Sequence, residues 1–123
     1  GNPNLVTAPL TALIKANQAQ LKLIVAAGPV LGNMKNYFDA AGLKAGAVKV
    51  AGFDLGKTVL GAFESGHVQL SADQEPFKQG YVPVVSLCLQ KVYGLSPASV
   101  DTSAGFVTTS NYKIVAALPA GYR

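Results

Sequence analysis

Short apolar runs of strand-forming residues alternate along this chain with segments that have the periodicity of amphipathic helices. Three runs have the length and composition of buried strands and cover residues 21–27, 48–53 and 68–72. The segments between them, residues 30–41 and 55–65, carry apolar side chains at three- and four-residue spacing, and a glycine follows each segment. Alternating strands and helices form right-handed βαβ units, so the sequence predicts an α/β fold with a parallel sheet.

Further elements are predicted on both sides of this alternation. Pro9, preceded by a threonine that can cap a helix, predicts a helix that begins near residue 7. A long helix is predicted over residues 77–93, where Pro83 should kink it or mark its first turns. A short fourth strand is predicted at residues 106–109, and the last dozen residues have only a weak pattern.

Composition limits the classes of protein to which the chain can belong. Its 123 residues make one domain at most, and with 50% hydrophobic residues the chain has enough apolar surface to bury. No apolar run reaches the ~18 residues that a membrane-spanning helix needs. The net charge of +4 comes from lysines scattered singly along the chain, whereas nucleic-acid surfaces cluster their basic residues. We therefore expect no nucleic-acid partner.

Catalytic chemistry has little support in the sequence. Cys88 is the only cysteine, which excludes an internal disulfide, and its apolar surroundings predict a buried structural residue. His67 begins the third strand, at the end away from the expected ligand side, so we expect it to be structural or exposed. Neither a nucleophile elbow nor a glycine-rich phosphate loop occurs. We expect no enzyme activity, no cofactor and no metal, and the alternative of acid–base chemistry by Asp54 and Asp73 has no further support.

Polar residues follow the predicted strands where a ligand is expected. Ligands of open α/β sheets bind beyond the carboxyl ends of the strands. The three strand ends carry Gly28, Asp54 and Gln74. A carboxylate accepts hydrogen bonds from two adjacent hydroxyls, an amide both donates and accepts, and a glycine lets a ligand approach the backbone. Phe53 and Phe77 lie nearby and offer apolar faces, so these strand ends predict a site for a hydroxyl-rich ligand.

The polar residues also have structural interpretations, which the sequence leaves open. Asp54 would cap the helix that follows it, and Gln74 would satisfy loop backbone groups. Asp73 and Glu75 are expected to be exposed or bonded to loop backbone. Lys57 is expected to be a surface residue of its helix.

Several motifs, taken in order, resemble one family. They are Val-Lys-Val-Ala-Gly-Phe-Asp at residues 48–54, Gln-Glu-Pro at 74–76, Gln-Gly-Tyr at 79–81 and Asp-Thr-Ser-Ala-Gly-Phe-Val at 101–107. Their order and spacing resemble the C-terminal part of bacterial periplasmic sugar-binding proteins of the ribose-binding type, which feed ATP-binding-cassette (ABC) importers. The resemblance covers about residues 11–111, nearly the whole chain.

The resemblance implies the type I periplasmic binding fold, in which two α/β lobes joined by three chain crossings clamp a sugar. Residues 1–123 would then form an incomplete C-terminal lobe, and the helix and loop at residues 77–103 would belong to the other lobe. Asp54 and Gln74 match family positions that hydrogen-bond sugar hydroxyls. Gly28 stands where ribose binders usually carry an Asn-Asp pair, which implies a different sugar or a backbone contact through this glycine.

The implied function is sugar binding in the periplasm without catalysis. The ligand would be a monosaccharide, and the partner would be the membrane permease of an ABC importer. The alternative is the effector-binding domain of a lac-repressor-type transcriptional regulator, which reuses the same lobes. An incomplete lobe with open sheet edges and an apolar helix without a neighbour also predicts a homo-oligomer, including a domain swap.

Overall fold

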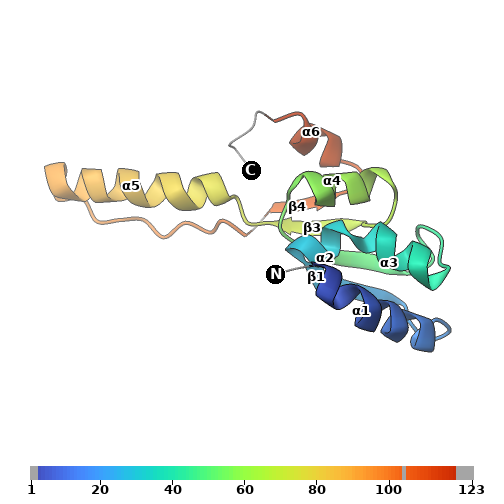
Figure 1. Ribbon diagram of the computed structural model, residues 1–123. Helices are drawn as coiled ribbons and strands as arrows, with labels where there is room; N and C mark the ends of the chain where they lie inside the picture. Colours follow the sequence, from blue (N-terminus) through green and yellow to red (C-terminus); the bar gives the residue numbers. More distant parts are fainter. Residues whose placement is uncertain (1–2, 104, 119–123) are drawn as a thin grey trace.

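The computed structural model describes residues 3–103 and 105–118, and its helices and strands alternate along most of the chain (Figure 1). In chain order the elements are α1 (Pro3–Asn17), β1 (Leu23–Ala27), α2 (Gly28–Gly32), α3 (Met34–Ala41), β2 (Lys49–Phe53), α4 (Lys57–Glu64), β3 (Leu70–Asp73), α5 (Pro76–Tyr93), β4 (Gly105–Thr108) and α6 (Tyr112–Ala116). This is the α/β class that the sequence predicts.

The strands form one four-stranded sheet in the order β1-β2-β3-β4. β1, β2 and β3 are parallel, as predicted, and Phe53 pairs with both Ala27 and Ala72. β4 pairs antiparallel with β3, so that Asp73 lies opposite Gly105. The chain therefore leaves the sheet after β3 and returns beside it from the opposite direction, with α5 between the two strands (Figure 1).

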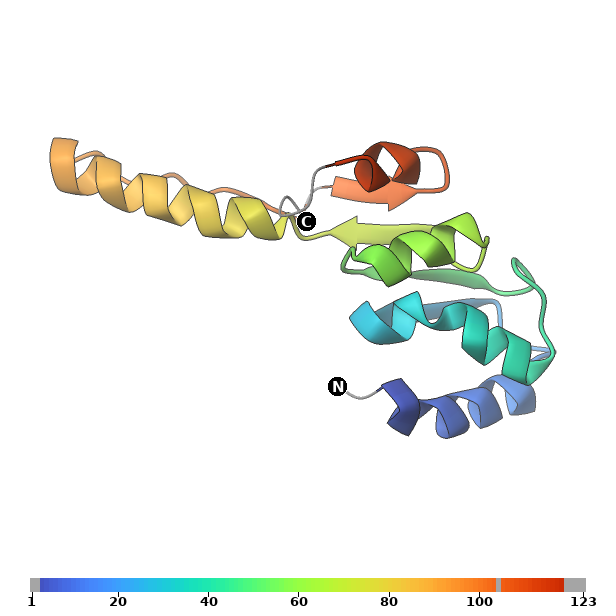
Figure 2. The same cartoon turned by 45° about the horizontal axis from the view of Figure 1, so that its top comes forward.

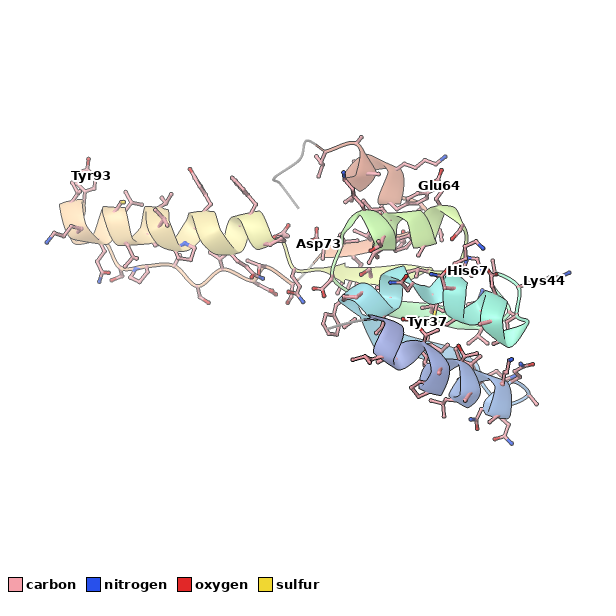
Figure 3. The ribbon with its side chains drawn as sticks, viewed as in Figure 1. Tyr37, Lys44, Glu64, His67, Asp73 and Tyr93 are labelled. Carbon is pink, nitrogen blue, oxygen red and sulfur yellow. The ribbon has the colours of Figure 1, made fainter. Side chains whose placement is uncertain are left out.

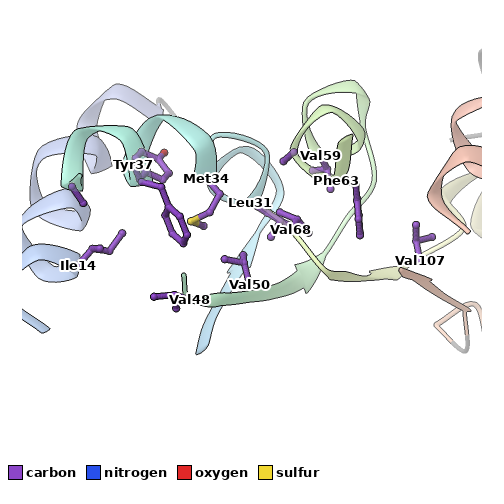
Figure 4. Close-up of a cluster of buried hydrophobic side chains, with 13 residues drawn as sticks. Ile14, Leu31, Met34, Tyr37, Val48, Val50, Val59, Phe63, Val68 and Val107 are labelled. Carbon is purple, nitrogen blue, oxygen red and sulfur yellow. The ribbon is translucent and has the colours of Figure 1, made fainter. Parts of the chain in front are cut away.

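The hydrophobic core lies between the helices and one face of the sheet (Figure 4). α2 contacts both β1 and β2, α1 packs on α3, and α4 packs on α2. The largest fully buried apolar side chains are Tyr37, Phe38, Ile14, Leu31, Met34, Val50, Val59 and Val68. These residues come from helices, from strands and from the segments just before strands. One contiguous core therefore joins the helices to the sheet.

The opposite face of the sheet is open and mostly apolar, with Lys49 as a charged residue at the start of β2. Phe53 pairs with Ala72, which in turn pairs with Phe106, so these side chains share a face. Leu23 and Val25 of β1 lie on this face too, because Ala27 of β1 pairs with Phe53 and alternate residues of a strand point to the same side. The exposed fractions of these four large side chains are 53% for Leu23, 67% for Val25, 44% for Phe53 and 58% for Phe106. Parallel sheets are normally covered on both faces, so this face lacks the cover that its composition requires.

Two glycines allow α2 to pack closely on its neighbours. A Cβ atom at Gly52 would lie 2.0 Å from the carbonyl oxygen of Ala26 and 2.8 Å from Leu31 Cδ2. A Cβ atom at Gly32 would lie 2.4 Å from Thr58 Oγ1 on α4. The absence of both side chains fixes the depth of α2 against β2 and α4, and hence the position of its first residue at the end of β1.

The helix predicted over residues 30–41 is divided into α2 and α3 by Asn33. The side-chain Nδ2 of Asn33 donates to the carbonyl oxygen of Pro29 at 2.8 Å, and its backbone N–H donates to the same oxygen at 3.2 Å. Asparagine side chains compete in this way with regular helical bonding, so the helix breaks at this residue. The helix also begins earlier than predicted, because α2 starts directly at the end of β1.

Both ends of the described chain are more helical than predicted. α1 begins at Pro3 rather than near residue 7 and continues through Pro9, which lacks the N–H for one helical bond. α6 forms where the sequence pattern is weak. The Tyr112 ring stacks on Phe63 of α4, with ring centroids 5.7 Å apart, so packing on α4 holds this short helix rather than its own periodicity.

α5 extends away from the sheet as an arm, and the extended chain that follows it runs back alongside (Figures 1 and 2). Gly94 ends the helix in a left-handed conformation at the predicted residue. None of the helix side chains is buried, so the prediction of a buried Cys88 is wrong: the thiol is exposed because no neighbouring element covers it. Among the described residues, no helix has the length and apolar character needed to cross a membrane.

Candidate functional site

The parallel register brings the residues that follow β1 and β2 side by side. Ala27 and Phe53 are paired as the last residues of these strands, so Gly28 and Asp54 emerge next to each other. A Cβ atom at Gly28 would lie 3.0 Å from Asp54 Oδ2, which places the carboxylate directly over this glycine. The structure thus places together two of the residues that the sequence assigns to a ligand site.

Asp54 is held in an unusual backbone conformation. Its φ of 79° lies in the left-handed region, which costs a non-glycine residue about 1–3 kcal/mol. Two hydrogen bonds from β3 keep it there: the Asp54 N–H donates to the Ala72 carbonyl at 3.2 Å, and Ser71 Oγ donates to the Asp54 carbonyl at 2.7 Å. Residues held in such conformations cluster at functional sites, because the surrounding structure must impose them.

The Asp54 carboxylate is available to a ligand. α4 begins at Lys57 with Gly56 as its cap residue, so the interpretation of Asp54 as a helix cap is wrong. Within residues 3–103 and 105–118, the carboxylate makes no hydrogen bond to another side chain or backbone group. The β3 bonds hold the Asp54 backbone while its two carboxylate oxygens remain free to accept.

Gln74 follows β3 at the same edge of the sheet, and side chains hold its peptide bond to Glu75 from both sides. The buried Asp73 accepts the Glu75 N–H with Oδ1 at 3.0 Å, and Gln79 Nε2 donates to the Gln74 carbonyl at 2.7 Å. The prediction that Asp73 is bonded to loop backbone is therefore confirmed, whereas an exposed Asp73 is wrong. The half-buried Gln74 side-chain amide has no partner within the described part of the chain.

Glu75 is the second residue of this edge with a left-handed backbone, at a φ of 50°. It is half-buried, and its carboxylate forms an ion pair with Lys78 one turn into α5. Glu75 thus stabilises the start of α5, and its carboxylate is engaged in this ion pair.

Two aromatic residues flank the edge. Phe53 ends β2 on the open face of the sheet. Phe77 is exposed at the start of α5, and its ring stacks on that of Tyr81 with centroids 5.7 Å apart. Both predicted apolar surfaces are therefore near the strand ends, with Phe53 belonging to the open face rather than to the helix-covered face.

His67 and Lys57 have the structural roles that the sequence predicts. His67 is buried at the amino end of β3, with Nδ1 3.0 Å from Ser65 Oγ and an edge-on contact to the Phe38 ring. Figure 3 shows His67 and Asp73 at opposite ends of the sheet. Lys57 is exposed at the start of α4. No three His, Cys, Asp or Glu side chains of the described residues come together as a potential metal site.

The chain crosses between the sheet and the arm twice, and side chains link the two crossings. Gln79 Nε2 also lies 3.3 Å from Thr102 Oγ1, on the returning segment. Next to it, the Asp101 carboxylate accepts from both the N–H and the Oγ of Ser103 at 2.8 Å. These two bonds hold the pKa of Asp101 below its ordinary value of 3.8. Sequence reasoning missed this link, because Gln79 and Thr102 are 23 residues apart in the chain.

Comparison with known proteins supports the predicted resemblance, although no family model matches the sequence. A xylose/arabinose-binding protein, XylF, of Sulfolobus acidocaldarius is 28% identical over 68 residues, which are 54% of this chain and 17% of that protein.

Solved structures match nearly the whole chain. A carbohydrate transporter from Acidothermus cellulolyticus in complex with myo-inositol is 28% identical with a TM-score of 0.77, over 94% of this chain and 40% of that one. A carbohydrate transporter solute-binding protein from Agrobacterium radiobacter in complex with D-arabinose is 28% identical with a TM-score of 0.67, over 89% of this chain and 38% of that one. The resemblance to sugar-binding proteins of ABC transporters and the predicted fold class are confirmed, and the chain spans about two fifths of these structures.

Proposed function

We propose that this chain binds a monosaccharide at the edge formed by Gly28, Asp54 and Gln74. The observation that carries the proposal is the free Asp54 carboxylate, which β3 holds over Gly28 in a strained left-handed conformation. Two carboxylate oxygens accept from adjacent hydroxyls of one ligand, which is the pattern that a sugar offers.

Gln74 supplies the complementary chemistry. Its amide donates to ring or hydroxyl oxygens and accepts from hydroxyls, whereas a carboxylate only accepts. Gly28 has a φ of 42° and no side chain, so a ligand can approach its backbone beside Asp54. Phe53 is proposed to offer an apolar surface to the carbon face of the sugar.

We place this binding activity in the periplasm, as the solute-binding component that delivers a sugar to the permease of an ABC importer. The proteins compared above are described as sugar-binding or carbohydrate-transport proteins, which supports transport over catalysis. The same descriptions favour transport over the alternative of an effector-binding domain in a transcriptional regulator. The full reading frame that encodes the chain distinguishes these two functions. A secretory signal encoded in that frame would support transport, and a helix-turn-helix would support regulation.

A second lobe is part of this proposal. The matched structures are more than twice as long as this chain, and α5 leaves all of its side chains unburied. We propose that residues 77–103 pack on the other lobe of a two-lobed protein, which closes on the sugar from the opposite side. Ligand pockets bury most of the ligand surface, so one lobe alone should bind a sugar only weakly.

NMR titration of the 123-residue chain with myo-inositol and D-arabinose tests the proposal. We expect shift changes confined to the neighbourhood of Gly28, Asp54 and Gln74, with affinity in the millimolar range. Asp54→Asn should weaken binding about 10-fold or more, because it removes a charged acceptor. Asp39→Asn, a change of the same kind on the exposed side of α3, should have no effect. Tight binding by the chain alone, or shift changes elsewhere, would contradict the proposal.

A further inference from the structure

We propose that Gln79 is a positioning residue that fixes the orientation of Gln74 and ties it to the returning chain at Thr102. The proposal rests on the proposed function in one respect, namely that Gln74 contacts the ligand. The link between the three residues stands on hydrogen-bond geometry alone.

The backbone of Gln79 is fixed by the first turn of α5. Its N–H donates to the carbonyl of Glu75 at 3.1 Å, so this helical hydrogen bond fixes the backbone from which the side chain extends. The amide nitrogen then lies 2.7 Å from the Gln74 carbonyl and 3.3 Å from Thr102 Oγ1. A primary amide has two N–H donors, so it can make both bonds at once.

The bond to Gln74 acts on a peptide group that is already held on its other side. Asp73 accepts the Glu75 N–H, and Gln79 donates to the Gln74 carbonyl, so one peptide unit is bonded at both of its polar atoms. Rotation of this unit would change the ψ of Gln74 and the left-handed φ of Glu75 together. The two bonds therefore hold the strained Glu75 conformation, and with it the direction in which the Gln74 side chain leaves the backbone.

The bond to Thr102 connects this peptide to the second crossing. Thr102 lies between Asp101 and Ser103, which form their own local turn through two bonds of 2.8 Å. A displacement of the returning chain therefore moves the hydroxyl that Gln79 contacts. Through Gln79, the orientation of the Gln74 side-chain amide thus depends on the position of the returning chain at Thr102.

The simple alternative is that Gln79 is a solvated surface residue, and Gln79→Met separates the two cases. Methionine keeps the length and helix propensity of glutamine but cannot donate. We expect amide exchange at Glu75 to accelerate about fivefold, which corresponds to the loss of one hydrogen bond. NMR shifts at Gln74 and Thr102 should change as well. Gln90→Met, at an exposed glutamine further along α5, is the matched control and should leave these signals unchanged.

A second variant and a ligand titration make the test specific. Thr102→Val keeps the side-chain shape and should perturb Gln79, and its effect should not add to that of Gln79→Met. D-Arabinose should bind the Gln79→Met chain several-fold more weakly than the wild-type chain. If neither D-arabinose nor myo-inositol binds the wild-type chain, the proposed function fails while the exchange measurement still tests the positioning role. Unchanged Glu75 exchange and unchanged shifts at Gln74 and Thr102 in Gln79→Met overturn the inference.

Discussion

Two residues with strained backbones follow neighbouring strands of the sheet: Asp54 comes directly after β2, and Glu75 comes two residues after the end of β3. Both are acidic residues at positive φ, where aspartate is tolerated better than most side chains and glutamate has no such advantage. Each is held by hydrogen bonds from its surroundings: Asp54 by β3, and Glu75 by the buried Asp73. Strain of this kind persists only when the surrounding structure imposes it, and the two residues differ in what their carboxylates do. The Glu75 carboxylate is paired with Lys78, whereas the Asp54 carboxylate has no hydrogen-bond partner among the described residues.

Relief of this strain gives a stability prediction. Asp54→Gly should raise the free energy of unfolding by about 0.5–1 kcal/mol, because glycine adopts a φ of 79° without a steric cost. The same change should abolish the proposed sugar binding, because it removes the carboxylate. Thermal or urea unfolding followed by circular dichroism measures the difference.

Asp39→Gly is the control for this prediction, because Asp39 lies inside the regular helix α3. There the substitution should lower stability by about 0.5–1 kcal/mol. A stability loss in Asp54→Gly as large as that in Asp39→Gly would count against strain at Asp54.

The turn at Asp101 gives a prediction about pH. Hydrogen bonds from the Ser103 N–H and Oγ depress the pKa of Asp101 below 3.8. A depressed folded pKa means that the turn is stabilised above the unfolded pKa and loses this stabilisation as pH falls through the folded value. The Ser103 amide shift should therefore titrate with a midpoint below pH 3.8.

Ser103→Ala isolates the contribution of the hydroxyl to this titration. It removes the Oγ bond, so the pKa of Asp101 should move back toward the ordinary value while the backbone bond remains. NMR titration of the Asp101 carboxyl carbon follows both proteins, and an Asp101 that titrates at or above 3.8 in the wild-type chain would exclude the turn in solution.

The positions of the candidate site residues were predictable, and their conformations were not. Parallel strands bring their carboxyl ends to one edge, so the sequence alone groups Gly28, Asp54 and Gln74. The left-handed conformation of Asp54 depends on bonds from another strand, and the burial of Asp73 depends on β4 beside it. The role of Gln79 depends on a residue 23 positions further along the chain, which no local pattern reveals.

At the scale of elements, the close contact of β2 with β1 and with α2 depends on the missing side chain of Gly52, because an added Cβ would meet Ala26 on β1 and Leu31 on α2. The nearest atom to an added Cβ is a backbone oxygen, which cannot move aside as a flexible side chain can. The position of α2 in turn sets the position of Gly28 at the end of β1. Packing of these two elements therefore controls the geometry of the candidate site.

Gly52→Ala should disturb the pairing of β2 with β1 and the packing of α2 on both strands. A Cβ atom 2.0 Å from the Ala26 carbonyl forces a shift of backbone, and overpacking in cores typically costs about 1–3 kcal/mol or more. Gly61→Ala is the matched control, because it lies in α4 with open space around its Cβ and should stabilise the helix by about 0.5–1 kcal/mol. Chemical denaturation of the two variants should give opposite changes, and equal tolerance of both would contradict this packing.

The predictable elements are those with strong local periodicity. β1, β2, β3, α4 and α5 were found close to their predicted positions because apolar spacing and glycine stops define them. The division at Asn33 and the short helix α6 depend on one side-chain bond and on packing against α4. The antiparallel direction of β4 follows from the path of the chain around α5, which periodicity does not encode.

At the scale of the whole molecule, none of the described residues covers two apolar surfaces, the open sheet face and the arm formed by α5. The rings of Phe53, Phe106, Phe77 and Tyr81 each keep about half of their surface exposed. An aromatic side chain buries about 150–250 Å² in full, so eight such side chains in a two-fold dimer offer on the order of 800 Å². Exposed valines and leucines of β1 and α5 add area toward the about 1,600 Å² of a standard interface.

These areas lead us to propose that the isolated 123-residue chain self-associates, with the arm of one copy on the open face of another. Light scattering over a concentration series should detect dimers at high micromolar concentration. Val25→Lys should weaken this association at least about 10-fold, because a lysine on the open face would be desolvated in the interface. Ala40→Lys adds the same charge to the exposed side of α3, on the helix-covered side, and should dimerise as the wild-type chain does. A wild-type chain that remains monomeric at high concentration, or a Val25→Lys chain that dimerises normally, would show that these surfaces do not bind each other.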